Sequence, residues 1–300
     1  MKKYISIIGP TASGKSALAL ELARALNGEL INCDSVQIYQ GFDIGAAKPS
    51  LAELREIPHH LIDILNGSED YDARAFARDA EEKITDIRNR NKTPIVVGGT
   101  GLYLRALWQD GFHDLPKSPE LRETLKDLNT DQLRLKLDQL DPERSREIHG
   151  NDRFRLQRAV EIATLLGHSV KDLPPPASKR DESFVIYLQT DRKVLAERIA
   201  RRSQIMLDQG LIDEVKQLLA QGISEKAKPM QSIGYYEVIQ SINQIFTKED
   251  LLEKITIATR QYAKRQETLF RKIPKDFIWN QDSSLDELIQ SAKDHLGLNR

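Results

Sequence analysis

Residues 4–16 read YISIIGPTASGKS, and this stretch decides the fold. It opens with a short apolar, β-branched run, which is typical of a buried parallel strand. A P-loop motif, G-x-x-x-x-G-K-[ST], follows with every fixed position matched, and apolar residues at helical spacing come next over Ser16–Leu26. Glycines let the backbone wrap around phosphate oxygens, Lys15 adds a charge, and the serine after it suits Mg²⁺. We therefore expect a ligand that carries a diphosphate or triphosphate. The residues expected to hold it are Gly9, Pro10, Thr11, Ala12, Ser13, Gly14, Lys15 and Ser16.

The rest of the chain alternates strand-like and helix-like segments. Strands are predicted at Tyr4–Ile8, Glu29–Cys33, Pro94–Val97, Phe184–Leu188 and Phe277–Trp279. Amphipathic helices are predicted at Ser16–Leu26, Ala73–Arg90, Val194–Leu219 and Lys248–Lys272. From 113 to 183 the pattern is helical, and prolines punctuate both ends. We predict an α/β fold, with a P-loop NTPase-like parallel sheet core made of residues 1–112 and 184–300 and a helical insertion domain at 113–183.

The composition of the 300-residue chain is that of an ordinary globular protein, with 30% charged residues and a net charge of -1. The net charge carries no information about nucleic acid. The single cysteine, Cys33, excludes an intramolecular disulfide and a Cys-rich zinc site. The longest N-terminal apolar run is too short for a signal peptide, and no run approaches the roughly 20 apolar residues of a membrane span. We expect a cytoplasmic, monomeric enzyme with no membrane partner.

Two more segments follow predicted strands, at the sheet edge where ligands bind in open α/β folds. Asp34 comes directly after the second strand, where a carboxylate can act as a general base or bind a metal. The plainer alternative is an aspartate that caps a turn or a helix. Gly98–Gly101, with sequence GGTG, follows the third strand, where an ordinary NTPase carries a metal-binding aspartate. The glycines allow a ligand close to the backbone and Thr100 offers a hydroxyl, although a plain strand-to-helix turn has the same pattern.

Basic residues crowd two segments of the predicted helices. They are Arg144, Arg146, Arg153, Arg155 and Arg158 in the insertion, and Arg260, Lys264, Arg265, Arg271 and Lys272 on the late helix. Such faces suit an RNA backbone, and arginine planes can stack on splayed bases; solvated helix charge is the alternative. Arg198, Arg201 and Arg202 lie where arginines often close over phosphates, and surface ion pairing explains them equally well. The pair His59-His60 does not suit a metal, because adjacent residues on a strand point to opposite faces.

Taken together, these motifs resemble the tRNA dimethylallyltransferase family, also called bacterial tRNA isopentenyltransferases or IPP transferases. The matching blocks, in family order, are GPTASGKS, DSVQIYQGFDIGAAKP, IPHHLIDI, PIVVGGTGLYLRAL, NDRFRLQRAVEI, RIARRSQIMLDQGLIDEV, QSIGYYEVI and ATRQYAKRQ. A lone P-loop is unspecific, whereas ordered blocks over nearly the whole chain are highly specific.

The resemblance implies transfer of a dimethylallyl group from dimethylallyl diphosphate to N6 of the adenosine 3′-adjacent to the anticodon of a tRNA, giving N6-isopentenyladenosine and diphosphate. It implies that Asp34 is the general base, that Thr100 orients the adenine, and that Arg202 neutralises charge on the leaving group. Mg²⁺ is the implied cofactor, with Ser16 as its ligand. The target base must leave the loop stack to react.

The implied partner is the anticodon stem-loop, held by the insertion and the late helix. The implied RNA-contacting residues are Ser35, Val36, Gln37, Thr100, Arg122, Phe154, Arg155, Leu156, Gln157, Arg158, Arg260, Gln261, Lys264 and Arg265. Three alternatives stay open from the residues themselves. They are an adenylate isopentenyltransferase acting on a free nucleotide, a P-loop kinase or NTPase, and a non-enzymatic RNA-binding module. The basic insertion favours tRNA over a free nucleotide, and the GGTG segment opposes NTP hydrolysis.

Overall fold

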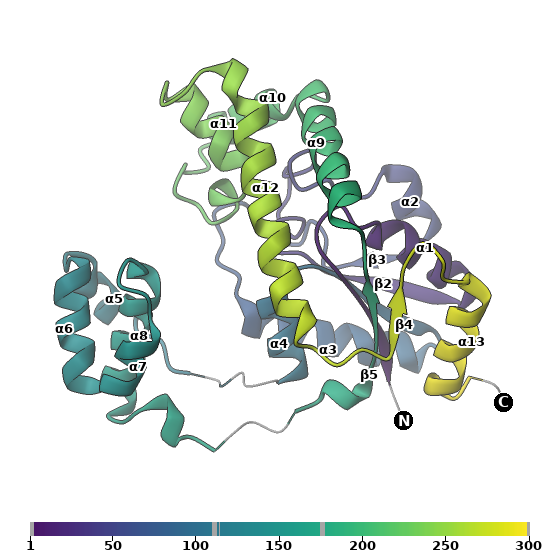
Figure 1. The fold of residues 1–300 in the computed structure, drawn as a ribbon, viewed down its shortest axis with the longest axis horizontal. Helices are drawn as coiled ribbons and strands as arrows, with labels where there is room; N and C mark the ends of the chain where they lie inside the picture. The colour runs from purple at the N-terminus through teal and green to yellow at the C-terminus, as the bar shows by residue number, and fades with distance from the viewer. Residues whose placement is uncertain (1–2, 110–112, 114, 175–177, 299–300) are drawn as a thin grey trace. The chain divides into compact units, whose positions relative to one another are not determined.

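The computed structural model describes residues 3–109, 113, 115–174 and 178–298. The chain forms two compact units, one made of Met1–Asp110 and Ser178–Arg300 and the other of Gly111–Ala177 (Figure 1). Residues 178–183, predicted as the end of the insertion, thus belong to the first unit. The reason is local: the Arg180 guanidinium lies 5.5 Å from the Trp108 ring centroid, and its Nη2 donates to the carbonyl of Pro274.

A six-stranded parallel sheet lies at the centre of the first unit, in the order β3-β2-β4-β1-β5-β6. The strands are β1 Tyr4–Ile8, β2 Gly28–Cys33, β3 His59–His60, β4 Thr93–Gly98, β5 Ser183–Leu188 and β6 Phe277–Trp279. The predicted α/β class is confirmed, and β3, only two residues long, is the strand that the five predicted ones lacked. In the register, Gly98 lies beside both Ile8 and Cys33. The segments that follow β1, β2 and β4 therefore meet at one edge of the sheet.

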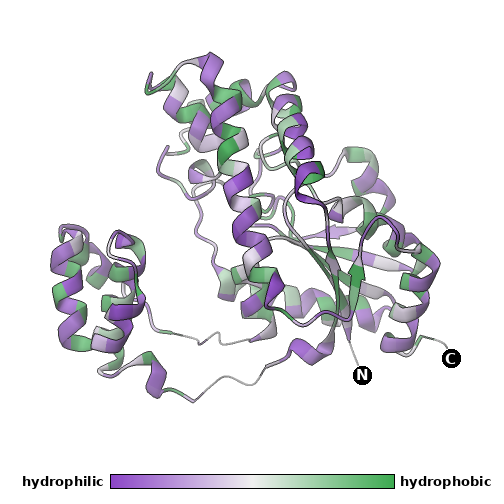
Figure 2. Ribbon diagram, viewed as in Figure 1, coloured by the Kyte–Doolittle hydropathy of each residue, from purple (hydrophilic) through white to green (hydrophobic). Residues whose placement is uncertain are grey.

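Helices cover both faces of this sheet. Ile5 and Ile7 alternate along β1 and pack, fully buried, in one core with α1 (Lys15–Ala25) and α13 (Leu285–Leu296). The other face carries α3 (Ala73–Asn89), which contacts β2 and β4 and packs against α4 (Gly101–Trp108). Figure 2 shows hydrophilic and hydrophobic residues in alternating stretches along the helices, as expected for helices with one face toward a core.

The segment predicted as one helix over Val194–Leu219 is two helices, and that prediction is wrong. They are α9 (Arg192–Asp208) and α10 (Leu211–Ala220). Between them Gly210 has φ 99°, a left-handed conformation that glycine adopts without steric cost and that ends a helix. The apolar periodicity continues across the break, so periodicity alone could not reveal it.

The remaining helices of the first unit are α2 (Leu51–Glu56), α11 (Tyr235–Ile242) and α12 (Lys248–Arg271). The long helix α12 packs along α9, which sets two basic helices side by side (Figure 1). Over the described residues, every helix is too short or too polar to cross a membrane.

The second unit is helical. Its helices are α5 (Pro119–Lys126), α6 (Thr130–Leu140), α7 (Pro142–Glu147) and α8 (Arg153–Leu166). Leu133, Leu137, Leu156 and Val160, all fully buried, form its own small core between α6 and α8. The second unit thus has a hydrophobic core separate from that of the sheet.

Candidate active site

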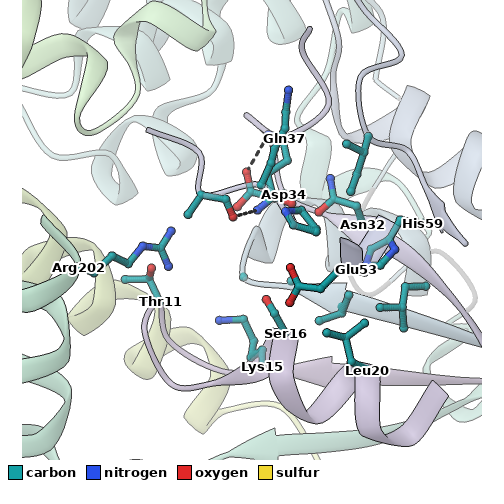
Figure 3. A pocket seen from close by; sticks show the side chains of 18 of the residues that line it. Thr11, Lys15, Ser16, Leu20, Asn32, Asp34, Gln37, Glu53, His59 and Arg202 are labelled. Atoms are coloured by element: carbon teal, nitrogen blue, oxygen red, sulfur yellow. Dashed lines mark hydrogen bonds between the residues drawn. The ribbon is translucent and has the colours of Figure 1, made fainter. Parts of the chain in front are cut away.

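A cavity of about 280 Å³ lies over the P-loop, at the carboxyl edge of the sheet (Figure 3). Lys15 and Ser16, at the start of α1, point into it from one side, and Asp34 faces them from the end of β2. Arg202, on α9, approaches beside Thr11. The side chains of Leu20, Leu30, Ile62 and Val97 give the cavity an apolar part. The cavity therefore combines a phosphate-binding wall with room for an apolar group.

Lys15 is partly buried in this wall. Its Nζ donates to the carbonyl of Pro10 at 2.7 Å. Burial and the positive charge of Arg202 lower the pKa of Lys15 to about 7, although Asp34 acts in the opposite direction. Burial also lowers the pKa of Arg202. Because both cations are costly to keep charged here, an entering polyanion gains strongly from meeting them.

The P-loop is tied to helix α9 as well. The Arg198 guanidinium donates to the carbonyl of Ser13 at 3.3 Å, so α9 brings this arginine to the loop as well as Arg202. Among the described residues, the Ser13 hydroxyl is buried without a hydrogen-bond partner. A buried hydroxyl of this kind is costly unless a ligand satisfies it, which fits a phosphate oxygen.

Asp34 caps a turn, the plainer of the two alternatives that the sequence left open, and it also faces the cavity. Its Oδ1 accepts from the backbone N–H groups of Val36 at 2.8 Å and Gln37 at 3.3 Å, which forms a turn. The side chain also lines the cavity. The turn fixes the carboxylate by one oxygen, and Oδ2 can then accept a proton from a substrate.

Thr100 is placed by the same loop. It occupies the N-cap position of α4, yet its Oγ1 accepts from the N–H of Ser35 at 3.2 Å. Burial, followed by the negative charge of Asp34, raises the pKa of the neighbouring Tyr262, whose hydroxyl interacts with Thr100. The Thr100 hydroxyl is thus oriented between the segment after β2 and the helix α12.

Gln266, on α12, is a site residue that sequence reasoning missed as such. Its Oε1 accepts from the N–H of Thr11 at 2.8 Å, and its Nε2 donates to the carbonyl of Gly99 at 2.9 Å. A Cβ on Gly99 would collide with that amide nitrogen. One buried amide therefore joins the P-loop to the GGTG segment. No local pattern marks Gln266 as a site residue, beyond its place in the ATRQYAKRQ block.

A second cavity of about 280 Å³ adjoins the first. The two share Thr11, Asp34, Arg202 and Tyr262 in their walls. The second cavity adds the predicted RNA-contacting residues Ser35, Val36 and Arg265. Apolar side chains complete it: Ile199, Met206, Ile233 and Ile255. Two ligands, one in each cavity, would meet at the Asp34 carboxylate.

The other predicted RNA-contacting residues of α12 are exposed. Arg260 and Lys264 border a groove between α9 and α12, together with Arg192. Gln261 is exposed on the same helix, and the Arg265 guanidinium lies 5.7 Å from the ring centroid of Tyr262. These side chains give the α12 surface a positive charge.

In the second unit, the predicted residues divide by environment. Phe154 is 81% exposed, and Arg155 beside it is exposed as well, whereas Leu156 is fully buried in the core. Leu156 can therefore influence RNA only through packing. Gln157 donates to the carbonyl of Arg122 at 3.2 Å, which is again an internal contact.

Two predicted arginines of this unit pair with one buried carboxylate. Arg122 Nε lies 2.9 Å from Glu161 Oε1, and Arg158 Nη1 lies 2.6 Å from Glu161 Oε2. Burial favours the neutral acid, yet hydrogen bonds from Arg158, Ser118 and Arg122 outweigh it and hold the pKa of Glu161 below its usual range. Arg158 therefore contributes to the internal packing of α8, because its charge is paired with that of Glu161.

The residues fit a magnesium ion only in company with a phosphate. Ser16 lines the first cavity next to Lys15, as its P-loop position requires. Within the described ranges, no three His, Cys, Asp or Glu side chains come together as a metal cage. Mg²⁺ is commonly held by one or two protein oxygens plus substrate phosphates, so this donor set suits it.

Comparison with known proteins agrees with this geometry. The IPP transferase family model matches residues 37–273. The tRNA dimethylallyltransferase 1 of Citrifermentans bemidjiense is 43% identical over 281 residues, 92% of this chain and 91% of that protein. The tRNA dimethylallyltransferase of Thermotoga neapolitana is 38% identical over 280 residues, 92% of each.

Solved structures are similar over the whole chain. The full-length tRNA isopentenylpyrophosphate transferase of Bacillus halodurans is 35% identical and superposes with a TM-score of 0.71, covering 99% of this chain and 96% of that one. A eukaryotic dimethylallyltransferase acting on tRNA is 28% identical with a TM-score of 0.80, covering 100% and 80%.

Proposed function

The chain belongs to the IPP transferase family, and we infer that it is a tRNA dimethylallyltransferase. It transfers a dimethylallyl group to N6 of the adenosine 3′-adjacent to the anticodon in tRNAs. The observation that carries this inference is the pair of cavities that share Thr11, Asp34, Arg202 and Tyr262. One cavity suits a diphosphate donor, the other suits a base, and a carboxylate lies where the two ligands meet.

We assign dimethylallyl diphosphate to the first cavity. Backbone N–H groups at the start of α1, with Lys15 and Arg202, hold the diphosphate, and the Ser13 hydroxyl gains a partner. The apolar side chains of the same cavity accept the five-carbon chain and exclude water, which protects an allylic centre from hydrolysis. Ser16 would help to hold Mg²⁺, which would supply positive charge to stabilise the leaving group.

The flipped adenine occupies the second cavity. As the N6 lone pair forms the new C–N bond, the bond from that carbon to the diphosphate oxygen breaks. One N6 proton passes to the Asp34 carboxylate, whose Oδ1 is held in its turn. Thr100, whose Oγ1 accepts from the N–H of Ser35, orients the base through its hydroxyl. Lys15 and Arg202 stabilise the departing diphosphate.

The exposed basic and aromatic residues support tRNA as the acceptor. Arg260, Lys264 and Arg265 on α12 offer charge to phosphates, and Phe154 with Arg155 in the second unit offers an aromatic face beside a cation. A free nucleotide would use neither group. All of these residues lie on one chain, so we propose that a monomer is sufficient for activity.

The test is direct. The protein is incubated with radiolabelled dimethylallyl diphosphate, Mg²⁺ and either unmodified tRNA, AMP, or ATP with a phosphoryl acceptor. We expect label in tRNA at the adenosine next to the anticodon. Label in AMP but not in tRNA would contradict the proposal in favour of an adenylate isopentenyltransferase, and phosphoryl transfer from ATP would favour a kinase.

A further inference from the structure

We propose that Glu214, outside both cavities, is a positioning residue that sets the acceptor side of the site through the loop Asp43–Lys48 and Gln37. This inference rests on the proposed function, because it assigns Glu214 and Gln37 to the adenine side of that reaction.

Glu214 lies on α10, just after the break at Gly210, and is 9% exposed. Its Oε2 accepts from the N–H groups of Asp43 at 3.1 Å and Ile44 at 2.7 Å. Its Oε1 accepts from the N–H of Gly45 at 3.1 Å. Successive backbone N–H groups that converge on one anion form a nest, a geometry that holds a loop in one conformation.

Tyr235, on α11, completes this anchor. Its hydroxyl donates to Glu214 Oε1 at 2.7 Å and accepts from the N–H of Ala46 at 3.2 Å. Burial and the charge of Glu214 raise the pKa of Tyr235, so the hydroxyl stays protonated as the donor. A Cβ on Gly45 would lie only 2.5 Å from the Tyr235 ring, so the loop can approach this closely only as glycine.

The anchored loop in turn holds Gln37. Gln37 Nε2 donates to the carbonyls of Ala46 at 3.1 Å and Ala47 at 3.2 Å. Both amide hydrogens thus point to the loop, which leaves Oε1 as the group that can accept from a ligand. Gln37 lines the first cavity, and its own N–H donates to Asp34, the carboxylate that lines both cavities.

This arrangement has a chemical purpose in the proposed reaction. An exocyclic amine carries two hydrogens, and Asp34 removes one of them. Gln37 Oε1 is a suitable acceptor for the other, so it orients the N6 lone pair toward the donor carbon. The backbone of the loop is also a wall: Gly45 and Ala46 line the second cavity, and Ala47 lines the first.

Stability alone is a weak reason for the Glu214 carboxylate. Burying a carboxylate costs free energy that its hydrogen bonds only offset, and an apolar residue usually packs at lower cost. A carboxylate does what an apolar residue cannot, because it fixes four donors in one geometry. Glu214→Gln tests this, because the amide NH₂ would face N–H donors.

The experiment is a double-mutant cycle on the full-length protein. We measure kcat and KM for tRNA and for dimethylallyl diphosphate in the wild type, Glu214→Gln, Gln37→Ala and the double variant. We expect each single change to lower kcat/KM for tRNA by about tenfold, with KM for dimethylallyl diphosphate within about twofold of the wild type. If Glu214 acts through Gln37, the double variant falls about tenfold rather than the roughly 100-fold of independent sites.

The matched control is Glu29→Gln. Glu29 is also a buried carboxylate, and it accepts from Arg90, Lys92 and His60 at the start of β2, the opposite end of the strand from Asp34. We expect the Glu29→Gln variant to lose stability, as Glu214→Gln does. Below the melting temperature of the variant, however, we expect its kcat/KM for tRNA to be unchanged and its effect not to be coupled to Gln37→Ala. If Glu214→Gln does not fold, Tyr235→Phe replaces it in the experiment, because this change removes only the hydroxyl that contacts Glu214 and Ala46. It should lower kcat/KM for tRNA by several-fold and couple to Gln37→Ala in the same way.

The outcomes separate the two hypotheses. If the wild type modifies tRNA but the effects of Glu214→Gln and Gln37→Ala on kcat/KM are additive, the positioning role is overturned and the proposed function stands. The same holds if Glu29→Gln couples to Gln37→Ala as strongly as Glu214→Gln does. If the wild-type protein does not transfer the dimethylallyl group to tRNA, both the proposed function and the positioning role are overturned.

Discussion

The backbone N–H of Thr11 donates a hydrogen bond to Oε1 of Gln266, 2.8 Å away and 255 residues later in the chain. The amide nitrogen of the same side chain, Nε2, donates to the carbonyl of Gly99. One side chain therefore sets the spacing between the loop that binds the donor diphosphate and the segment that carries Thr100. The first prediction concerns this bridge.

Gln266→Leu keeps the approximate volume but leaves the Thr11 N–H and the Gly99 carbonyl unpaired. An unsatisfied buried group costs about 1–3 kcal/mol, so we expect a melting temperature lower by several degrees. We also expect kcat to fall by at least about tenfold, because donor and acceptor lose their spacing. Thermal unfolding and single-turnover assays check this, and unchanged turnover would show that the bridge is structural only.

Asp34→Asn separates the turn from the proton transfer. The asparagine Oδ1 still accepts from Val36, so the loop stays in place, but the amide cannot take a proton. We expect the chemical step to slow by about 10²–10⁴-fold. Filter binding should give an affinity for tRNA within about threefold of the wild type. A rate near that of the wild type would exclude Asp34 as the base.

Binding of inorganic diphosphate should take up protons near pH 8. The pKa of Lys15 is lowered to about 7 in the unliganded protein, so above that value Lys15 is mostly neutral. A bound anion raises this pKa again, so Lys15 gains a proton on binding and the affinity falls as the pH rises above about 7. Calorimetry in buffers of different ionisation enthalpy measures the uptake.

Lys15→Arg is the control for this pH dependence. Arginine stays charged over the same range, so the variant reports only the titration of diphosphate itself. The difference between wild type and variant isolates Lys15. Equal proton uptake by the wild type and by Lys15→Arg would show that Lys15 is not the group that gains a proton when diphosphate binds.

Two neighbours on α8 should separate binding from stability. Phe154 is 81% exposed, so Phe154→Ala should change the melting temperature by less than about 2 °C while weakening tRNA binding several-fold. Leu156 is fully buried, so Leu156→Ala should destabilise the second unit by about 2–5 kcal/mol. Protease resistance and tRNA titration distinguish the two, and a Phe154→Ala variant with unaltered tRNA affinity would remove Phe154 from the interface.

The sequence predicts the parts of the site that depend on local pattern. The P-loop, Asp34 and Thr100 each follow a strand directly, so the sheet brings them to one edge. The break at Gly210 escaped prediction because the apolar spacing of α9 continues into α10. The glycine at position 210 is the feature of the sequence that could have indicated the end of α9.

Gln266 and Glu214 could not be predicted, because their roles depend on contacts made across more than half of the chain. Glu214 looks like an ordinary acid in the first turn of a helix, where such residues are common. Its partners, Asp43 to Gly45, lie about 170 residues earlier in the sequence. Only the tertiary fold shows that the acid is buried against them.

The interlock between Gly99 and Gln266 also limits how the protein can change over generations. A side chain at position 99 would strike the amide, and a larger residue at position 266 would strike the glycine. A side chain at position 99 therefore requires a smaller residue at position 266. We expect the two sites to vary jointly among relatives, and a library built to broaden the prenyl donor should randomise them as a pair.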